Sequence, residues 1–193
     1  MSATAADPAD RAIDRAYSRG RVGSHREAPV SRDAKSSWKD EGLAEHDRPL
    51  ARRGRRAAKA IGRHIREQGV EPELVLCSTA RRVRETLEGM EPALRRGAIR
   101  VEPELYGAGA AELLARLHEI APAVRSVMVI GHNPALEQLA LLLARHGSMR
   151  SELEAKFPTG AFATLAFRGP GWAALDRGTT ELIEFIRPRD LES

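Results

Sequence analysis

The sequence predicts an α/β fold, a three-layer sandwich in which a mostly parallel central sheet has helices on both faces and an antiparallel edge near the C-terminus. Residues 74–77 and 127–130 are short, continuous apolar runs, which are typical of strands buried on both faces. Helical periodicity alternates with these runs, and this order indicates parallel strands joined by helices. Residues 161–167 and 181–186 are strand-like and are separated by glycine-containing turns, so we expect them to pair at the antiparallel edge.

Helical periodicity predicts four helices, one before the first of these strands and three after it. The first carries Ala57, Ile61 and Ile65 on one stripe and is expected to end at Gly69. A short strand is expected just before Pro103. The remaining helices are expected over residues 80–96, 110–120 and 134–146.

Length and composition indicate one domain preceded by a tail. A chain of 193 residues suits a single domain, and its 42% hydrophobic and 30% charged residues are ordinary for a soluble globular protein. Residues 1–28 contain few large apolar side chains, so they cannot bury enough surface to offset the entropy of ordering. We therefore predict a disordered tail over residues 1–28 and a folded domain over residues 29–193.

The same composition limits the class of protein. The single cysteine, Cys77, excludes a disulfide framework and a cysteine-based zinc cluster, and it favours a reducing cytoplasm as the location. No apolar run approaches the ~20 residues that a membrane-spanning helix needs. The histidines show no metal-ligand spacing, so we expect no metal and no other cofactor.

Basic residues concentrate on and just before the first predicted helix, in a chain with a net charge of +4. This basic cluster is compatible with a solvated face, with a docking surface for an acidic phosphoprotein, or with nucleic-acid binding. Nucleic-acid binding is the least favoured of the three, because such surfaces usually add stacking aromatic residues and this stretch has none. The cluster comprises Arg48, Arg52, Arg53, Arg55, Arg56, Lys59, Arg63 and Arg66.

Polar motifs follow the two buried strands, at the sheet edge where open α/β folds bind their ligands. After the first strand, Arg82 and Thr86 lie four residues apart on one helical face, whereas Arg81 and Arg84 are expected in solvent. Arginine is well suited to recognising phosphate through two parallel hydrogen bonds. This edge is therefore a candidate phosphate site.

The second motif is Gly131-His132-Asn133-Pro134. Asn133 is a favourable N-cap residue, and Pro134 suits the first position of a helix. His132 is then expected between a strand end and a helix N-terminus, where free backbone N–H groups favour an anion.

These motifs resemble the histidine phosphatase superfamily, and in particular its SixA-type phosphohistidine phosphatase branch. In that branch the first motif is Arg-His-Ala-Lys-Ser, and this chain has Arg32-Asp33-Ala34-Lys35-Ser36, followed by Ser37-Trp38. The matching stretches follow the family order within about residues 31–187. They are residues 32–36, 47–50, 53–54, 78–86, 131–132 and 157–161.

The resemblance implies a pocket of two arginines and two histidines. One histidine attacks phosphorus, while the other histidine and the arginines stabilise the equatorial oxygens. Carried over, Arg32, Arg82 and His132 are the catalytic and substrate-binding residues, and Asp33 stands at the position of the nucleophile. Some branches take a general acid from the region of Glu104, which is otherwise a surface or capping residue.

Asp33 departs from the family pattern. Aspartate is shorter than histidine and negatively charged, so it repels a phosphate dianion and competes for the same arginines. Other phosphatases use an aspartate nucleophile, but they commonly rely on magnesium, and no carboxylate cluster here indicates a magnesium site. We therefore expect impaired turnover.

The first strand departs from the pattern as well. The residues before Arg32 are Ser24-His25-Arg26-Glu27-Ala28-Pro29-Val30-Ser31, whereas a central parallel strand is normally a continuous apolar run without proline. Either the chain is a degenerate relative, or the sequence around residues 1–33 is altered and the true first strand has been lost.

Three functions remain open. The first is a phosphatase acting on phosphohistidine or on another protein-borne or small phosphomonoester. The second is a non-catalytic phosphate- or phosphoprotein-binding module that uses Arg32, Arg82 and His132. The third and least favoured is a basic nucleic-acid-binding protein.

Overall fold

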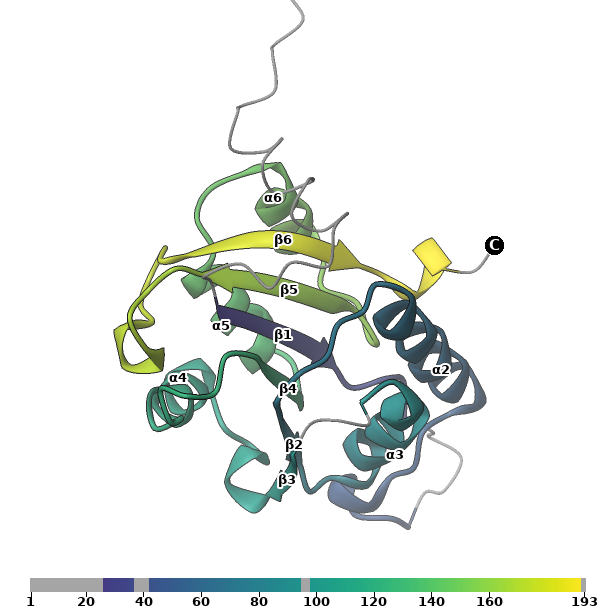
Figure 1. The fold of residues 1–193 in the computed structure, drawn as a ribbon. Coiled ribbons are helices and arrows are strands. Elements are labelled where there is room, and N and C mark those ends of the chain that lie inside the picture. The colour runs from purple at the N-terminus through teal and green to yellow at the C-terminus, as the bar shows by residue number, and fades with distance from the viewer. Residues whose placement is uncertain (1–25, 37–41, 95–97, 192–193) are drawn as a thin grey trace, which may run out of the picture.

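A computed structural model describes residues 26–36, 42–94 and 98–191 (Figure 1). One six-stranded sheet has the order β3-β2-β4-β1-β5-β6. The pairs β3–β2, β2–β4 and β4–β1 are parallel, and the pairs β1–β5 and β5–β6 are antiparallel. The predicted mostly parallel sheet with an antiparallel C-terminal edge is confirmed. The strands are β1 (Arg26–Arg32), β2 (Leu74–Ser78), β3 (Ala98–Glu102), β4 (Val127–Gly131), β5 (Phe162–Phe167) and β6 (Thr180–Ile186).

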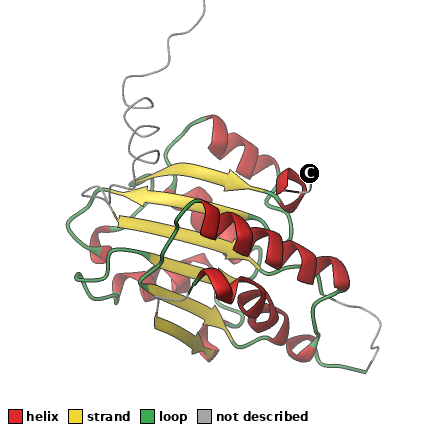
Figure 2. Ribbon diagram, turned by 45° about the vertical axis from the view of Figure 1, so that its right-hand side comes forward, coloured by secondary structure: helices red, strands yellow, loops and turns green. Residues whose placement is uncertain are grey.

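Helices cover both faces of the sheet, as the three-layer prediction requires (Figure 2). One face packs against α2 (Arg52–Glu67) and α3 (Arg81–Met90), through Ile61, Ile65 and Val83 among others. The other face packs against α4 (Ala110–His118), α5 (Ala135–Leu143) and α6 (Ser148–Ala155). The sequence did not predict α6, because Leu153 is its only fully buried residue and no apolar stripe marks it.

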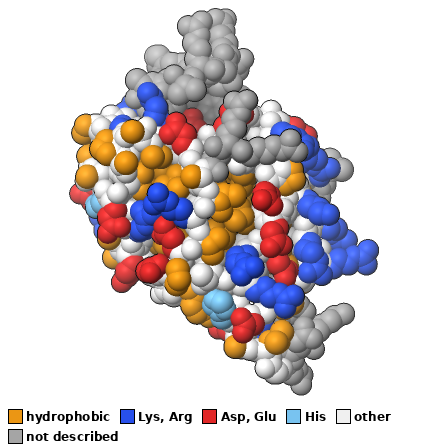
Figure 3. All heavy atoms as spheres, turned by 60° about the horizontal axis from the view of Figure 1, so that its bottom comes forward, with side chains coloured by type: hydrophobic (Ala, Val, Ile, Leu, Met, Phe, Trp, Pro, Cys, Tyr) orange, Lys and Arg blue, Asp and Glu red, His pale blue; other side chains and the backbone are white. Residues whose placement is uncertain are grey.

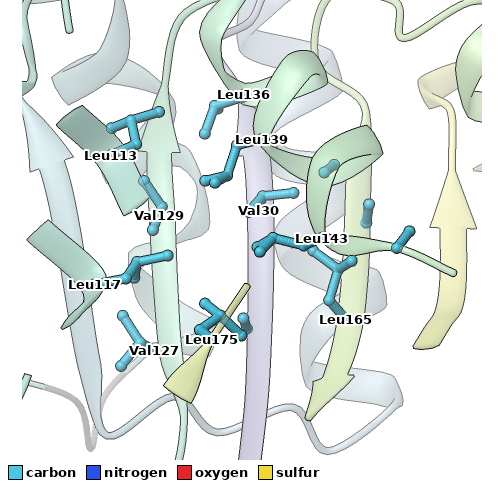
Figure 4. Packing of buried hydrophobic residues seen from close by; sticks show 14 of the residues in the cluster. Val30, Leu113, Leu117, Val127, Val129, Leu136, Leu139, Leu143, Leu165 and Leu175 are labelled. Carbon is cyan, nitrogen blue, oxygen red and sulfur yellow. The ribbon is translucent and has the colours of Figure 1, made fainter. Parts of the chain in front are cut away.

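The core between the sheet and α5 holds β1 in place. Val30 of β1 points toward Leu139 and Leu143 of α5, and all three side chains are buried (Figure 4). Full burial of one such side chain stabilises the fold by about 1.5–3 kcal/mol. The sheet centre therefore has a conventional aliphatic core, although β1 itself is polar at both ends.

β1 lies at the centre of the sheet despite Pro29. The backbone N–H groups of Glu27 and Asp33 point to the same side, where they donate to the carbonyl oxygens of Arg125, just before β4, and of Gly131, at its end. Because N–H groups alternate along a strand, position 29 also faces β4, and proline supplies no donor there. The parallel pairing with β4 accordingly runs from Val30 to Arg32, with only an isolated bridge between Glu27 and Ser126 before it, whereas the pairing with β5 is continuous from Arg26 to Ser31.

The position of β1 corrects the predicted domain boundary in part. Residues 26–28 were assigned to the disordered tail, but they are the first residues of a central strand. Burial of Ala28 and the antiparallel pairing with β5 outweigh their weak apolar character. Residues 1–25, the rest of the predicted tail, lie outside the described residues, as do Ser37 and Trp38.

Candidate active site

Three strands and one helix bring the candidate residues together at the carboxyl edge of the sheet. Asp33 follows β1, Ser78 ends β2, His132 follows β4, and Arg82 lies in the first turn of α3. Arg82 Nε donates to Asp33 Oδ2 at 2.8 Å, and its Nη2 atom lies 3.1 Å from His132 Nδ1. The structure therefore unites Asp33, Arg82 and His132 in one cluster.

The hydrogen bonds of His132 fix the position of its ring proton. Arg82 can only donate, so the Nδ1 atom of His132 must accept the bond from Arg82. The proton of the neutral ring then lies on Nε2, which is 2.9 Å from Ser78 Oγ and donates to it. Asp33 Oδ2 is 3.7 Å from Nδ1, beyond hydrogen-bond range.

The backbone around Asp33 is anchored on three sides. Its N–H group donates to Gly131 O at 2.8 Å, and its carbonyl oxygen accepts from the N–H group of Gly160 at 3.1 Å. The next N–H group, that of Ala34, donates to Thr86 Oγ1 at 3.2 Å, and this hydroxyl donates to Arg82 O at 2.7 Å. Thr86 thus ties the loop after β1 to the helix that carries Arg82.

Arg32 has a different environment from the one that the family pattern predicts. Its Nη1 atom donates to the carbonyl oxygen of Phe157, and its Nε atom is buried without a hydrogen-bond partner among the described residues. Burial lowers the pKa of Arg32 from its ordinary value, an effect that the charges of Asp33 and Glu137 oppose. Arg32 adjoins the cluster through its neighbour Asp33, but among the described residues it makes no hydrogen bond to Arg82 or His132.

The helix start after His132 differs from the prediction. Pro134, not Asn133, occupies the cap position of α5, and no side chain caps this helix. The Nδ2 group of Asn133 instead donates to Glu137 Oε2 at 2.6 Å and, more weakly, to Phe157 O at 3.4 Å. The prediction was wrong because α5 begins one residue later than expected, and Asn133 Oδ1 is buried without a hydrogen-bond partner in the described chain.

Glu45, His46 and Tyr106 complete the rim of the cluster, and no sequence motif pointed to any of them. The carbonyl oxygen of Glu45 accepts from Arg82 Nη1 at 2.7 Å. The ring of Tyr106 packs edge-on against both His46 and His132, with centroids 4.8 and 5.6 Å apart. Glu45 and His46 lie in a three-residue 3-10 helix and Tyr106 directly follows another, and such short elements carry no periodic pattern in the sequence.

Arg81 and Arg84, which lie near Arg82 in α3, face solvent, as predicted. Arg81 pairs with Glu85 at 2.9 Å along the surface of α3. Glu104 is also exposed. The hydrogen bond to Glu102 is the largest cause of the raised pKa of Arg116, and the charge of Glu104 adds to it only after those of Glu102 and Glu119. Within the described chain, Glu104 makes no hydrogen bond or ion pair with Asp33, Arg82 or His132.

Two further findings bear on the class of protein. In the described ranges, no three His, Cys, Asp or Glu side chains converge as a metal site requires. None of the helices there is long and apolar enough to cross a membrane.

All members of the basic cluster except Arg48 are exposed along α2, and Arg48 lies before this helix and is half-buried. Figure 3 shows Lys and Arg side chains gathered on the side of the molecule that carries this helix. Glu85 pairs with Arg55 of this cluster at 3.5 Å.

A cavity of about 620 Å³ adjoins the cluster at Arg32 and Asp33. The loop after β1, the start of α2, the segment before β5 and the turn after β6 form its walls. Arg82 and His132 are not part of its lining. The cavity and the Arg82–His132 cluster are therefore neighbouring regions that share the residues after β1.

Comparison with known proteins identifies the family. The model of the histidine phosphatase superfamily (branch 1) matches residues 30–121. A protein of Nakamurella multipartitia assigned as phosphohistidine phosphatase SixA has 31% identity and a TM-score of 0.75, with 85% of this chain and 96% of that chain covered. For a SixA assignment from Agrobacterium tumefaciens, the identity is 28% and the TM-score 0.72, with 84% and 98% covered. An uncharacterized protein of Mycobacterium tuberculosis is 36% identical over 164 residues, which are 82% of this chain and 99% of that protein.

The chain belongs to the histidine phosphatase superfamily, and its structural similarity to SixA proteins agrees with the resemblance in the sequence motifs.

Proposed function

We propose that the domain binds the phosphoryl group of a phosphohistidine, or of another protein-borne or small phosphomonoester, and that Asp33 impairs its turnover. The observation that carries this proposal is the position of Arg82, whose guanidinium contacts both Asp33 and His132 at the carboxyl edge of the sheet. A planar guanidinium there can donate two parallel hydrogen bonds to phosphoryl oxygens. Arg82 and Asp33 are mostly buried, with side chains 11% and 12% exposed, so such bonds would be only weakly screened by solvent.

A bound phosphoryl group would accept hydrogen bonds from donors that are engaged by acceptors of the protein in this structure. Arg82 Nε is engaged by Asp33, so phosphate must displace this carboxylate or share the guanidinium with it. Arg32 supplies a buried Nε–H group without a partner, next to Asp33. His132 would contribute a donor only after protonation or after breaking its bond to Ser78, because its remaining nitrogen accepts from Arg82.

Nucleophilic attack on phosphorus is the step of catalysis that Asp33 is expected to impair. A histidine nucleophile attacks phosphorus through a neutral nitrogen, and the bond from phosphorus to the leaving atom breaks. Attack by Asp33 would instead form an acyl phosphate and withdraw the carboxylate from its ion pair with Arg82. A lost nucleophile removed about 10⁶ in rate in a serine protease, and we expect a loss of that order here.

The ion pair also supports a second candidate function, a non-catalytic module that binds phosphate or a phosphoprotein. The buried Arg82–Asp33 pair stabilises the cluster without any substrate, which suits a binding site as well as a catalytic one. The expected partners are then phosphorylated proteins, and the exposed basic face of α2 is suited to acidic ones.

The decisive experiment is the substitution Asp33→His, measured by hydrolysis of an aryl phosphate and by trapping of a phosphoenzyme. The change removes the competing charge and returns a ring nitrogen beside His132, so turnover should rise by orders of magnitude. Asp33→Asn is the matched control, because it removes the charge without adding a nucleophile. A folded, phosphate-binding Asp33→His protein without turnover would favour the binding module. An unmodified protein that turns over equally fast would refute this account of Asp33.

A further inference from the structure

The cavity beside Asp33 is lined by an unusual excess of cations. Six of its lining residues are basic, and they come from four separate segments of the chain. Asp33 is the one carboxylate among the lining residues, and it is already paired with Arg82. The basic lining residues are Arg32, Lys35, Arg53, Lys156, Arg187 and Arg189.

Only part of this charge is compensated within the described chain. Arg187 pairs with Asp190 at 2.9 Å and with Glu152 at 3.5 Å, and Arg189 lies 3.7 Å from Asp190. Lys35, Arg53 and Lys156 have no ion-pair partner among the described residues, and the Nε–H group of Arg32 is buried and unpaired. Cations that converge without partners repel one another, so an anion bound between them would be stabilised.

The start of α2 adds to the positive electrostatic potential in the cavity. Arg53 and Gly54 lie in its first turn and line the cavity. This turn contains no acidic residue and no side-chain cap of its own. The carboxylate near it is that of Glu85 in α3, which accepts from the N–H group of Leu50 and pairs with Arg55. Basic residues in a first turn are unfavourable by themselves, and a bound anion reverses that penalty.

We propose that this cavity binds a second phosphoryl group on a small-molecule ligand, whose first phosphoryl group lies at Arg82 and His132. The inference rests on the proposed function, because it defines the substrate class of the same site as a small organic bisphosphate. A volume of about 620 Å³ between four segments lies in the range of small-ligand sites. Arginine and lysine together suit phosphoryl oxygens, by paired hydrogen bonds and by point charge respectively.

The test compares ligands with one and with two phosphoryl groups by titration calorimetry on the full chain. The probes are propyl phosphate and a series of α,ω-alkanediol bisphosphates of increasing length. We expect one bisphosphate length to bind about tenfold or more tightly than propyl phosphate, because the linker must span the two regions. A phosphoserine peptide with flanking aspartates is the comparison for a protein-borne ligand.

Two triple variants make the test specific. Lys35→Ala/Arg53→Ala/Lys156→Ala removes three exposed cavity cations, and Arg52→Ala/Arg56→Ala/Lys59→Ala removes three exposed α2 cations that do not line it. Both lower the net charge equally. The cavity variant should lower the ratio of bisphosphate to monophosphate affinity about tenfold, and the control variant should leave this ratio unchanged.

The outcomes separate this inference from the proposed function. If propyl phosphate binds in an Arg82-dependent way but no bisphosphate binds more tightly, the cavity proposal fails alone. Equal losses in both triple variants would also overturn it, because general charge would then explain the affinity. A peptide that matches the best bisphosphate, with the same dependence on the cavity cations, would replace the small molecule by a phosphoprotein. If propyl phosphate does not bind at all, the proposed function itself fails.

Discussion

Arg82 holds Asp33 through a bond of 2.8 Å between Nε and Oδ2, in a cluster where both side chains are about nine-tenths buried. The same guanidinium reaches His132 Nδ1 and Glu45 O. One arginine therefore organises the strand ends, and removing it leaves a buried carboxylate without its counter-charge. Breaking a buried pair in this way typically costs about 3–5 kcal/mol.

We expect Arg82→Ala to weaken phosphate binding roughly ten- to a hundredfold, because a charge-assisted contact contributes about 1.5–3 kcal/mol. Titration calorimetry with inorganic phosphate measures this change. Arg81→Ala is the control, since Arg81 is exposed and pairs only with Glu85 among the described residues. Unchanged affinity in Arg82→Ala would exclude this residue from the site.

Asp33→Asn should strengthen phosphate binding, because it removes a negative charge that competes for Arg82 while keeping a side chain of the same size. The affinity for inorganic phosphate should rise about tenfold, with no gain in aryl phosphate hydrolysis. Weaker binding in Asp33→Asn would show that the carboxylate orients Arg82 for its ligand and does not compete with it.

Gly54→Ala should destabilise the domain by about 1–3 kcal/mol. A Cβ atom at this position would lie 2.5 Å from the carbonyl oxygen of Lys35, a backbone atom that cannot move away easily. That carbonyl also accepts from the N–H group of Ala51 at 2.8 Å, so the clash would disturb the junction between the loop after β1 and α2. Gly42→Ala is the control, because no atom of the described residues lies within 4 Å of its added Cβ atom. Urea unfolding of both variants measures the difference.

The buried pair of His64 and Glu184 predicts a pH dependence of stability. Their bond of 2.6 Å between Nε2 and Oε1 is the largest cause of a raised pKa for His64, and burial opposes it. A raised folded-state pKa means that this stabilisation is fully present below the unfolded pKa of about 6.5 and is lost as the pH rises through the folded pKa. The free energy of unfolding of the wild type, relative to His64→Gln, should therefore fall as the pH rises from 6 toward 9. A flat difference would show that the pair does not titrate in this range.

The sequence predicted the sheet and its polar edge well, because these depend on local patterns. The apolar runs that became β2 and β4 place Ser78 and His132 at their ends, and the four-residue spacing places Arg82 beside them. The sequence did not predict the contact from Arg32 to Phe157 or the packing of Tyr106 on His132, since both join segments that are distant in the chain. It also undervalued β1, because the antiparallel partner β5 stabilises a strand that its own residues do not mark.

Because Pro29 interrupts the pairing of β1 with β4, the backbone pairing between these two strands is locally weakened. The two strands pair continuously only from Val30 to Arg32, next to the cluster. At the opposite end of β1 the pairing is a single bridge at Glu27. Local opening should begin at that far end, so amide hydrogens near residues 125–127 should exchange with solvent sooner than those near residues 129–131. The cluster around Asp33 thus lies at the end of the β1–β4 pairing that is expected to open last.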